Sequence, residues 1–448
     1  RFASFNVGDK EFISTKVSYD REKDIFDDLT ERSVPVASAK QGQKVRRVST
    51  MGAPLSKEQL AGVQLAVDFG LALITGGPGT GKSTLVATLV RELKNRNRDV
   101  TLCAPTGRAA KRLQEAPDLK GVKPSTIHRM LSAKKSGAIK KIGTLIIDEA
   151  SMIDLDLMGQ VLSVLDKDDA LIFIGDANQL PPVGPGQLFR DLLKTDAVKS
   201  LALTENFRQS ADGGIVEAAN KVVHGEPPGG RSMISDNGFS FFSEDDEAAL
   251  QTLVLDLYFK GIPREIGIDP IADIQILTPQ RTGLLGTLAL NRKIQARLWP
   301  GKKPAFQDPK NDQKLPLFVG DKVINTSNNY EIGVMNGDIG TIVAERDGFL
   351  VEFDGVQKKY KEEDLASLEP AYAVTVHKAQ GSEYPSVILP VAKSHIHMLG
   401  RNLIYTGLTR GKRCVVAAGS IEAFNSGIGA AWKDFRYSVL PCFFEHPV

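Results

Sequence analysis

Short apolar runs recur along the chain from about residue 55 onward, and each run ends in a polar or glycine-rich cluster. Segments with helical spacing lie between several of these runs. Strands of a parallel sheet that is covered on both faces are continuously apolar rather than alternating. The pattern therefore predicts an α/β fold, with ligand sites at the carboxyl ends of parallel strands. The runs are Leu71–Ile74, Val100–Ala104, Leu145–Ile147, Leu171–Ile174, Ile274–Leu277, Val387–Leu389 and Cys414–Ala417.

The apolar runs form two groups, which are separated by the proline- and glycine-rich segment Gly225–Gly230. Such a segment is typical of a domain boundary. We therefore expect a first α/β domain at residues 51–225. A second α/β domain is expected at residues 226–314 together with residues 371–448.

Residues 315–370 have a different pattern, of short alternating segments. The dipeptides Asn336-Gly337, Asp347-Gly348 and Asp354-Gly355 are hairpin-turn signals. This pattern predicts a small β-barrel inserted in the second domain. Residues 1–50 are polar with a basic stretch, and we expect an N-terminal remnant or linker there, with a nucleic-acid contact as the alternative.

Composition sets wide bounds on the class of protein. The 448 residues, 42% hydrophobic and 25% charged, are ordinary for a globular protein. A net charge of +2 neither demands nor excludes nucleic acid, because a strand-binding groove needs only local basic charge. Cys103, Cys414 and Cys442 are far apart and form no Cys/His cluster, which predicts no structural zinc. The odd count and the apolar settings of Cys103 and Cys414 predict reduced, buried thiols in the cytoplasm. No apolar run is long enough to cross a membrane.

Gly76–Ser83 reads G-G-P-G-T-G-K-S and fits the phosphate-loop pattern G-x-x-x-x-G-K-[ST]. An apolar run precedes it and a helical segment follows, which argues against the alternative of a chance glycine-rich turn. The loop N–H groups and the helix N-terminus can bind phosphate, Lys82 can neutralise it, and Ser83 can ligate Mg²⁺. The expected nucleotide-binding set here is Gly76, Gly77, Pro78, Gly79, Thr80, Gly81, Lys82, Ser83 and Thr84.

Two further apolar runs end in candidate catalytic residues. Asp148 and Glu149 follow the run Leu145–Ile147, so Asp148 can hold Mg²⁺ and Glu149 can activate the attacking water. An isolated Asp-Glu pair is more often a solvated surface pair. Gln179 follows the run Leu171–Ile174 and can report the γ-phosphate, the alternative being an ordinary turn.

The order and content of the motifs resemble superfamily 1 helicases of the 5′→3′ branch, and among them the RecD-like enzymes, over roughly residues 50–420. The resemblance implies two RecA-like motor domains with an SH3-like insert, and ATP and Mg²⁺ as cofactors in the cleft between the motor domains. It makes Gln59 the residue that reads adenine and Glu383 the residue that faces the ribose. Arg208 and Arg410 then reach the γ-phosphate, the alternative for each being a surface ion pair.

The same resemblance implies a groove for a nucleic-acid strand across both domains. Hydroxyls and donors suit phosphates and sugars, which carry no sequence information. For His128 and His377, a purely structural histidine is the alternative. The residues expected to contact the strand are Pro105, Thr106, Gly107, Thr126, His128, Thr278, Arg281, Thr375, His377 and Lys378.

Residues 132–141 fall where the family places a strand-separating hairpin. The segment is short and basic here, so the wedge is either rudimentary or partly missing. The family also often has a longer N-terminal region than residues 1–50 supply.

The sequence as a whole predicts an ATP-dependent 5′→3′ DNA helicase or translocase of DNA repair and recombination. We expect a monomer that acts on single-stranded DNA and on tailed duplex DNA. An RNA-translocating helicase is the first alternative, because it shares most of these motifs. A regulatory phosphate-loop protein is the second, although Glu149 and the paired arginines argue against it. No separate acidic cluster supports a nuclease.

Overall fold

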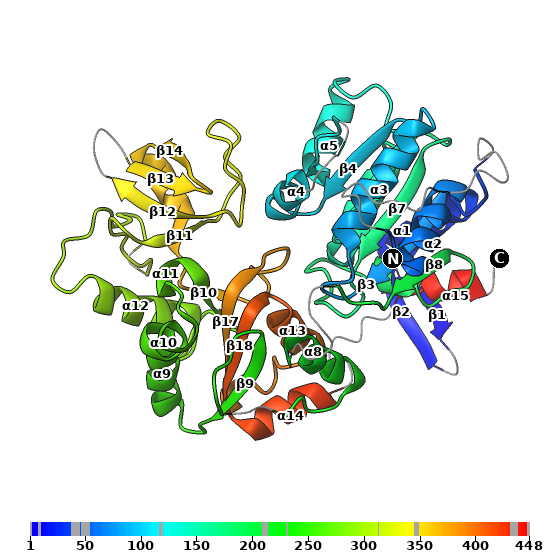
Figure 1. The fold of residues 1–448 in the computed structure, drawn as a ribbon. Helices are drawn as coiled ribbons and strands as arrows, with labels where there is room; N and C mark the ends of the chain where they lie inside the picture. The colour runs from blue at the N-terminus through cyan, green and yellow to red at the C-terminus, as the bar shows by residue number, and fades with distance from the viewer. Residues whose placement is uncertain are drawn as a thin grey trace. The chain divides into compact units, whose positions relative to one another are not determined.

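The computed structural model describes residues 2–7, 10–36, 45, 54–115, 119, 121–207, 214–229, 232–311, 313–344, 349–430 and 438–445. The chain folds into two compact units. The first comprises Arg1–Arg208 and Asp434–Val448, and the second comprises Gln209–Lys433 (Figure 1). The chain therefore passes from the first unit to the second and returns at its C-terminal end.

A six-stranded parallel sheet forms the centre of the first unit, with the strand order β5-β4-β6-β7-β3-β8. Side chains that alternate along β3, such as Leu73 and Ile74, enter two different cores, one on each face of the sheet. This double burial is the reason for the continuous apolar runs. The strands are β3 (Leu71–Gly76), β4 (Val100–Ala104), β5 (Ser125–Thr126), β6 (Thr144–Ile147), β7 (Ala170–Gly175) and β8 (Lys199–Leu203).

Helices cover both faces of this sheet (Figure 1). One core contains residues of α2 (Lys57–Asp68), α3 (Lys82–Asn95) and α4 (Gly107–Gln114). The other contains residues of α1 (Lys16–Arg32), α5 (Ile127–Lys135), the 3₁₀ turn η1 (Ala150–Met152), α6 (Leu155–Leu162), α7 (Leu188–Leu192) and α15 (Leu440–Glu445). Serine, threonine or aspartate caps many of these helices, among them Thr15 for α1 and Asp154 for α6.

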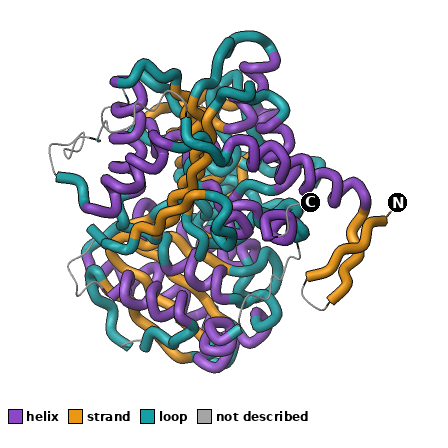
Figure 2. Tube along the Cα trace, turned by 90° about the vertical axis from the view of Figure 1, so that its right-hand side faces the viewer, coloured by secondary structure: helices purple, strands orange, loops and turns teal. Residues whose placement is uncertain are grey.

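The N-terminal residues are folded where the structure describes them. β1 (Phe2–Val7) and β2 (Lys10–Thr15) form an antiparallel hairpin that leads into α1, beside the label N in Figure 2. Ile25 and Leu29 of α1 are fully buried in the first unit. The expectation of a linker at residues 1–50 therefore differs from the structure up to residue 32, because an apolar helix face needs a core.

A five-stranded parallel sheet forms the centre of the second unit, with the order β16-β10-β17-β18-β9. The strands are β9 (Gly238–Ser243), β10 (Ile274–Thr278), β16 (Ala373–Thr375), β17 (Tyr384–Val391) and β18 (Gly411–Gly419). The accompanying helices are α8 (Gly214–His224), α9 (Glu247–Asp256), the π-helical η2 (Leu257–Gly261), α10 (Ile262–Ile266), α11 (Pro270–Asp273), α12 (Thr287–Leu298), η4 (Lys393–His395), α13 (Arg401–Leu408) and α14 (Ile421–Gly429).

An antiparallel sheet of order β14-β13-β12-β11-β15 is inserted between β10 and β16. It has its own core, in which Val323, Ile342 and Val351 are fully buried. Asp354 and Gly355 form the turn between β13 and β14 with φ of 47° and 77°, as an Asp-Gly hairpin turn requires. Asp347-Gly348 lies outside the described residues. The elements are β11 (Lys322–Asn325), β12 (Ile339–Ala344), β13 (Phe349–Phe353), β14 (Val356–Tyr360), η3 (Glu362–Ser367) and β15 (Leu368–Pro370).

The expected fold class, two parallel-sheet motor domains with a β insert, is confirmed, and every apolar run of the sequence is a strand. The unit boundary differs from the expected one at residue 225. It falls at Arg208, because α8 packs with α13 in the second unit. The segment from Asp434 onward belongs to the first unit, not the second. Cys103 and Cys414 are free and buried, as expected.

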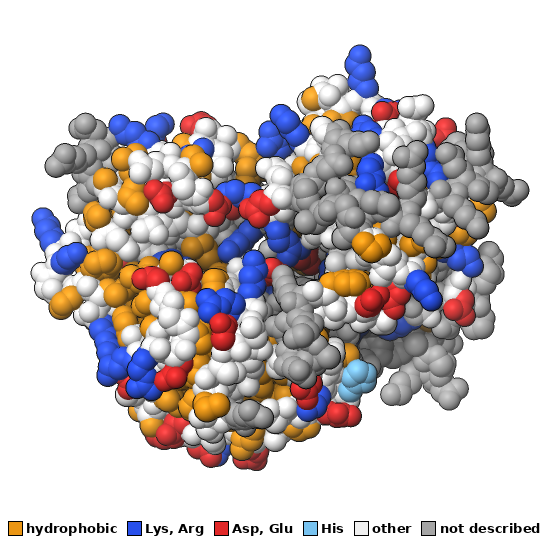
Figure 3. Space-filling model, viewed as in Figure 1, with side chains coloured by type: hydrophobic (Ala, Val, Ile, Leu, Met, Phe, Trp, Pro, Cys, Tyr) orange, Lys and Arg blue, Asp and Glu red, His pale blue; other side chains and the backbone are white. Residues whose placement is uncertain are grey.

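Among the described residues, none of the helices combines the length and the apolar character needed to cross a membrane. Basic and acidic side chains are interspersed over the face seen in Figure 3, in keeping with the small net charge.

Candidate nucleotide site and strand-contact residues

The phosphate loop joins β3 to α3 in the first unit. Gly81 caps α3 with φ of 77°, and a Cβ there would clash with the side chain of Gln59. Glycine is therefore required on two counts, backbone conformation and space. The Lys82 ammonium donates to the carbonyl oxygens of Gly76 at 2.6 Å and Gly77 at 2.8 Å. Lys82 thus lies over the loop that the sequence predicts to bind phosphate.

Gln59 lies against this loop from helix α2. It is 5% exposed, and its amide nitrogen is 3.5 Å from the carbonyl oxygen of Thr80. Its amide oxygen accepts from the backbone N–H of Ser56 at 3.1 Å, within a capping box. The capping box holds the glutamine at the edge of the phosphate loop, where the resemblance places an adenine-reading residue.

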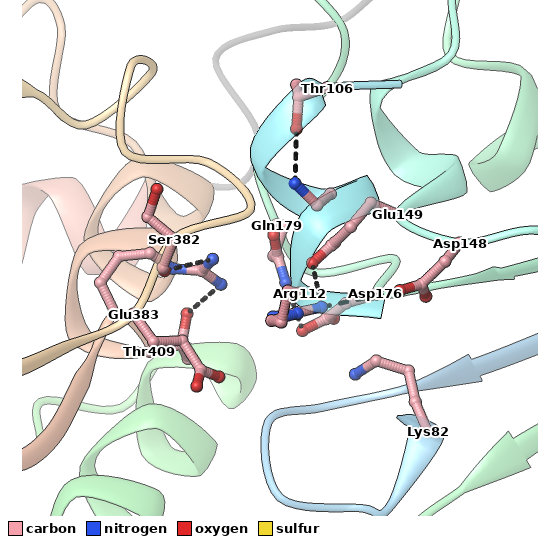
Figure 4. A network of polar contacts seen from close by, with 12 residues as sticks. Lys82, Thr106, Arg112, Asp148, Glu149, Asp176, Gln179, Ser382, Glu383 and Thr409 are labelled. Atoms are coloured by element: carbon pink, nitrogen blue, oxygen red, sulfur yellow. Dashed lines mark hydrogen bonds and ion pairs between the residues drawn. The ribbon is translucent and has the colours of Figure 1, made fainter. Parts of the chain in front are cut away.

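Asp148 and Glu149 follow β6, at the same sheet edge as the phosphate loop, and each is 2% exposed. Glu149 has φ of 54°, an uncommon left-handed conformation for glutamate. The Arg112 guanidinium lies 3.0 Å from Glu149 Oε1 and 3.6 Å from Asp148 Oδ2 (Figure 4). Burial, followed by the charge of Glu149, raises the pKa of Asp148, and the cations Arg112 and Lys82 oppose that shift.

The loop after β7 brings Gln179 to the same edge. The Gln179 amide donates to Asp176 Oδ2 at 3.3 Å, and the Asn178 backbone N–H donates to Asp176 Oδ1 at 3.0 Å. The N–H of Ala177 donates to the hydroxyl of Thr75 at 3.3 Å, which ties this loop to the end of β3. Three neighbouring parallel strands thus present the phosphate loop, the acidic pair and Gln179 together (Figure 4).

The segment after β8 is bound to the phosphate loop. Asn206 donates to the carbonyl oxygen of Pro78 at 2.7 Å, and the Phe207 N–H donates to that of Gly79 at 2.8 Å. Glu58 of α2 accepts from the backbone N–H of Thr204 at 2.7 Å. Arg208, the predicted γ-phosphate contact, lies outside the described residues. Asn206 was not singled out from the sequence, although it lies two residues before Arg208.

Arg410 and Glu383 belong to the second unit. Arg410 is 3% exposed, and its guanidinium donates to the carbonyl oxygens of Thr406 at 3.2 Å and Ser382 at 3.1 Å. Glu383 carboxylate Oε2 is 3.4 Å from the ammonium of Lys412. These hydrogen bonds hold Arg410 at the end of α13, so the alternative of an exposed surface ion pair does not fit its burial.

The predicted strand-contact residues of the first unit follow two neighbouring strands. Ala104 of β4 is paired with Thr126 of β5. Pro105, Thr106 and Gly107 come directly after β4, and Thr106 caps α4 by accepting from Ala109 N–H at 3.2 Å. Thr126 caps α5 in the same way, and His128 is exposed in the first turn of α5. The structure therefore brings Thr106 and Thr126 to one sheet edge.

In the second unit, two predicted cations share one acid. The Arg281 guanidinium donates to Glu369 Oε1 at 2.8 Å, and the Lys378 ammonium donates to Glu369 Oε2 at 2.9 Å. Burial alone would raise the pKa of Glu369, but Lys378 and Arg281 outweigh it and the pKa is lowered. These side chains line a cavity of about 230 Å³, together with Thr375.

Two other predicted strand contacts in the second unit have contrasting settings. His377 is exposed. Thr278 is fully buried, and its hydroxyl donates to the carbonyl oxygen of Leu285 at 2.7 Å. The structure thus gives Thr278 a packing role at the end of β10, because no surface of this residue is open to a strand.

Residues 132–141 contain no strand, and all of them are described. Helix α5 continues to Lys135, and a turn leads on towards β6. The Lys134 ammonium donates to the carbonyl oxygen of Lys140 at 3.0 Å and to Asp166 Oδ2 at 3.2 Å. The segment is therefore a helix end and a loop rather than a hairpin.

Three family models match the chain: an AAA domain at residues 54–242, a UvrD-like helicase C-terminal domain at residues 370–417, and the SH3 domain of ATP-dependent RecD-like DNA helicases at residues 290–353. The ATP-dependent RecD2 DNA helicase of Deinococcus radiodurans is 34% identical over 86% of this chain and 52% of its own length. The chain thus spans about half of that relative. The RecBCD enzyme subunit RecD of Mycobacterium tuberculosis is 30% identical over 83% of this chain and 70% of its own length.

Solved structures of Pif1 helicases have a similar fold. The Bacteroides enzyme in complex with ADP-AlF3 and ssDNA has a TM-score of 0.52 at 21% identity, over 82% of this chain and 92% of the other. The Candida albicans enzyme has a TM-score of 0.52 at 19% identity, over 88% and 98%. By its matches to the RecD sequences, the chain belongs to the RecD-like family of superfamily 1 ATP-dependent DNA helicases.

Proposed function

We propose that this protein is an ATP-dependent 5′→3′ DNA helicase, which moves on single-stranded DNA and separates tailed duplexes. The observation that carries the proposal is the grouping of Lys82, Asp148, Glu149 and Gln179 at one edge of the first unit's sheet. This grouping supplies charge neutralisation, a carboxylate at the nucleophile and a phosphate sensor, which phosphoryl transfer to water requires.

The nucleotide phosphates lie against the loop N–H groups and Lys82, and Glu149 orients and deprotonates the attacking water. The residues also fit Mg²⁺. Asp148 Oδ1 is buried and accepts no hydrogen bond from the described residues, and Ser83 lies in the first turn of α3, directly after Lys82. Mg²⁺ bound by Ser83 and Asp148 would neutralise charge that develops on the phosphates. Gln59 contacts the adenine, Glu383 the ribose, and Arg208 and Arg410 the γ-phosphate.

The strand lies on Thr106 and Thr126 in the first unit and on Arg281, Thr375, His377 and Lys378 in the second. Hydroxyls, helix N-termini and cations of this kind bind phosphates and sugars, so the protein moves along DNA of any sequence. Single-stranded and tailed duplex DNA are the proposed partners, and the proposed working form is a monomer.

The 5′→3′ direction rests on the RecD-like character of the second unit. The chain carries the β insert that matches the RecD-like SH3 model and lacks room for a large insertion between Ala104 and Asp148. Direction of movement is a property that the nucleotide chemistry alone does not select, since both branches of the superfamily hydrolyse ATP in the same way.

Steady-state ATP turnover with defined strands tests the proposal and separates it from an RNA-translocating helicase. We expect turnover to rise strongly with unstructured DNA oligonucleotides and only weakly with RNA of the same length and sequence. Equal or greater stimulation by RNA would favour the RNA enzyme. Turnover that responds to neither strand would favour a regulatory nucleotide-binding protein.

A further inference from the structure

Arg112 connects the predicted strand-contact segment to the predicted catalytic acids, and its role was not apparent from the sequence. It lies in α4, which starts at Gly107, directly after Thr106. The Arg112 guanidinium reaches Glu149 Oε1 at 3.0 Å and Asp148 Oδ2 at 3.6 Å. Figure 4 shows Thr106 at one end of this helix and the Arg112 side chain turned towards Glu149.

The environment makes the ion pair with Glu149 a strong one. Both acidic side chains are 3% exposed and Arg112 is 29% exposed, so water screens the pair weakly. A charge-assisted hydrogen bond in such a setting is about twice as strong as a neutral one. While the guanidinium binds Oε1 of Glu149, it holds the carboxylate turned towards α4 and takes up one of the acceptor positions at which the attacking water could bind.

Helix α4 is a short and rigid link between the two sites. The Thr106 hydroxyl caps it, and Ala109, Ala110 and Leu113 pack into the first unit's core. Six residues at a rise of 1.5 Å place Arg112 about 9 Å along the axis from Thr106. Packed helices commonly shift slightly when a ligand binds. A strand bound at the N-terminal end of α4 would therefore displace the Arg112 guanidinium at its other end.

We propose that Arg112 is a positioning residue that restrains Glu149 in the absence of a strand, and that a strand bound at Pro105–Gly107 relieves the restraint through α4. ATP hydrolysis is then slow until the strand is engaged. This inference rests on the proposed function, because it requires both the strand site at Thr106 and the water-activating role of Glu149. The competing role for Arg112 is static neutralisation of two buried acids.

The test is steady-state ATP turnover of Arg112→Gln, without a strand and with a saturating oligothymidylate. Loss of the guanidinium should raise the strand-independent rate by about tenfold, the scale of one charge-assisted hydrogen bond, and leave the stimulated rate nearly unchanged. The ratio of the two rates therefore falls. Lys111→Gln removes the same charge from the same helix and should keep the wild-type ratio.

A purely structural role predicts a different outcome, in which both rates fall together and the ratio stays as in the wild type. That outcome would overturn the inference. Binding of a fluorescent ATP analogue and thermal unfolding verify that the variant is folded. If Arg112→Gln does not fold, Arg112→Lys decides, because a lysine cannot reach both acids with a fork of donors. The ratio of stimulated to unstimulated turnover in Arg112→Lys should fall below that of the wild type, and a wild-type ratio would overturn the inference.

Failure of the proposed function has a separate signature. If wild-type turnover does not respond to any strand, both the proposed helicase activity and the proposed coupling through Arg112 are refuted. If a strand stimulates wild-type turnover but the ratio of stimulated to unstimulated rates is unchanged in Arg112→Gln, only the coupling through Arg112 is refuted.

Discussion

Glu22 and Ser438, from the two ends of the chain, are joined by a hydrogen bond of 2.6 Å from the serine hydroxyl to the glutamate carboxylate. The same carboxylate oxygen accepts from the backbone N–H of Leu440 at 2.9 Å. Phe443 packs on Tyr19 of α1 with ring centroids 5.5 Å apart. The C-terminal segment is therefore part of the first unit's structure, although it follows the second unit in sequence.

The acids near this junction make the first unit sensitive to pH. Burial raises the pKa of Glu22 and raises that of Asp191 to about 6, against 3.8 for an ordinary aspartate. Between pH 3.8 and 6 the native state holds a proton on Asp191 that the unfolded chain has lost, so the stability that Asp191 contributes is greatest at the acidic end of this range and is lost as pH rises through 6. At ~1.4 kcal/mol per pKa unit, Asp191 contributes at most about 3 kcal/mol to this loss.

Chemical denaturation at roughly pH 5 and pH 7.5 measures the effect. We expect the wild type to lose stability between these values and Asp191→Asn to lose clearly less, because the amide carries no charge to desolvate. Asp196→Asn alters an exposed aspartate nearby and should follow the wild type. A pH dependence in Asp191→Asn equal to that of the wild type would contradict the assignment.

Replacing Lys82 tests the phosphate loop. We expect Lys82→Ala to lower ATP turnover by roughly a hundredfold or more, because the ammonium stabilises charge on the transferring phosphoryl group. Its melting temperature should change little, since among the described residues the ammonium donates hydrogen bonds only to carbonyl oxygens of the phosphate loop. The exposed Lys123 of the same unit provides the matched control, Lys123→Ala. Normal turnover in folded Lys82→Ala protein would rule out this loop as the ATPase site.

Substitutions at Glu149 and Asp148 should distinguish the hydrolysis of ATP from its binding. Glu149→Gln is expected to slow hydrolysis by about 10²–10⁴-fold, because a general base is lost, while ATP and strand affinities stay near wild type. Asp148→Asn should weaken Mg²⁺-dependent nucleotide binding as well. Titrations with a fluorescent nucleotide and single-turnover rates measure both quantities. An equal loss of nucleotide affinity in the two variants would count against the division of roles.

Strand binding should depend strongly on salt and weakly on base sequence, because phosphate contacts dominate it. Arg281→Gln removes one cation and should make the slope of log affinity against log salt shallower by about 0.7. Lys293→Gln, at an exposed position of α12, is the control and should keep the wild-type slope. A marked sequence preference at constant salt, or an unchanged slope in Arg281→Gln, would conflict with the proposed contacts.

The sequence predicted the sheets because their central strands are apolar on both faces, and such runs are hard to mistake in an α/β pattern. Strand β8 was not predicted, because it lies at the sheet edge, where the exposed polar side chains of Lys199 and Ser200 interrupt the apolar run. The unit boundary was misplaced because the turn residues at Gly225–Gly230 follow α8, whereas packing of α8 assigns it to the second unit.

The candidate site was predicted only as far as local motifs reach. Lys82 and Glu149 lie within motifs whose flanks fix their geometry. Arg112 has no local signal, because its ion pair joins residues 37 positions apart. A search for a cation to balance two adjacent buried acids is the one sequence argument that would have suggested it. The burial of Thr278 likewise depends on its contact with Leu285, which no motif encodes.

Directional movement on DNA driven by ATP can be tested with a pair of tailed duplexes. One duplex carries a single-stranded 5′ tail and the other a 3′ tail of the same length and sequence, and strand separation is followed after addition of ATP and Mg²⁺. We expect separation of the 5′-tailed duplex, none of the 3′-tailed duplex, and none of either by Lys82→Ala. Separation of the 3′-tailed duplex alone would contradict this expectation.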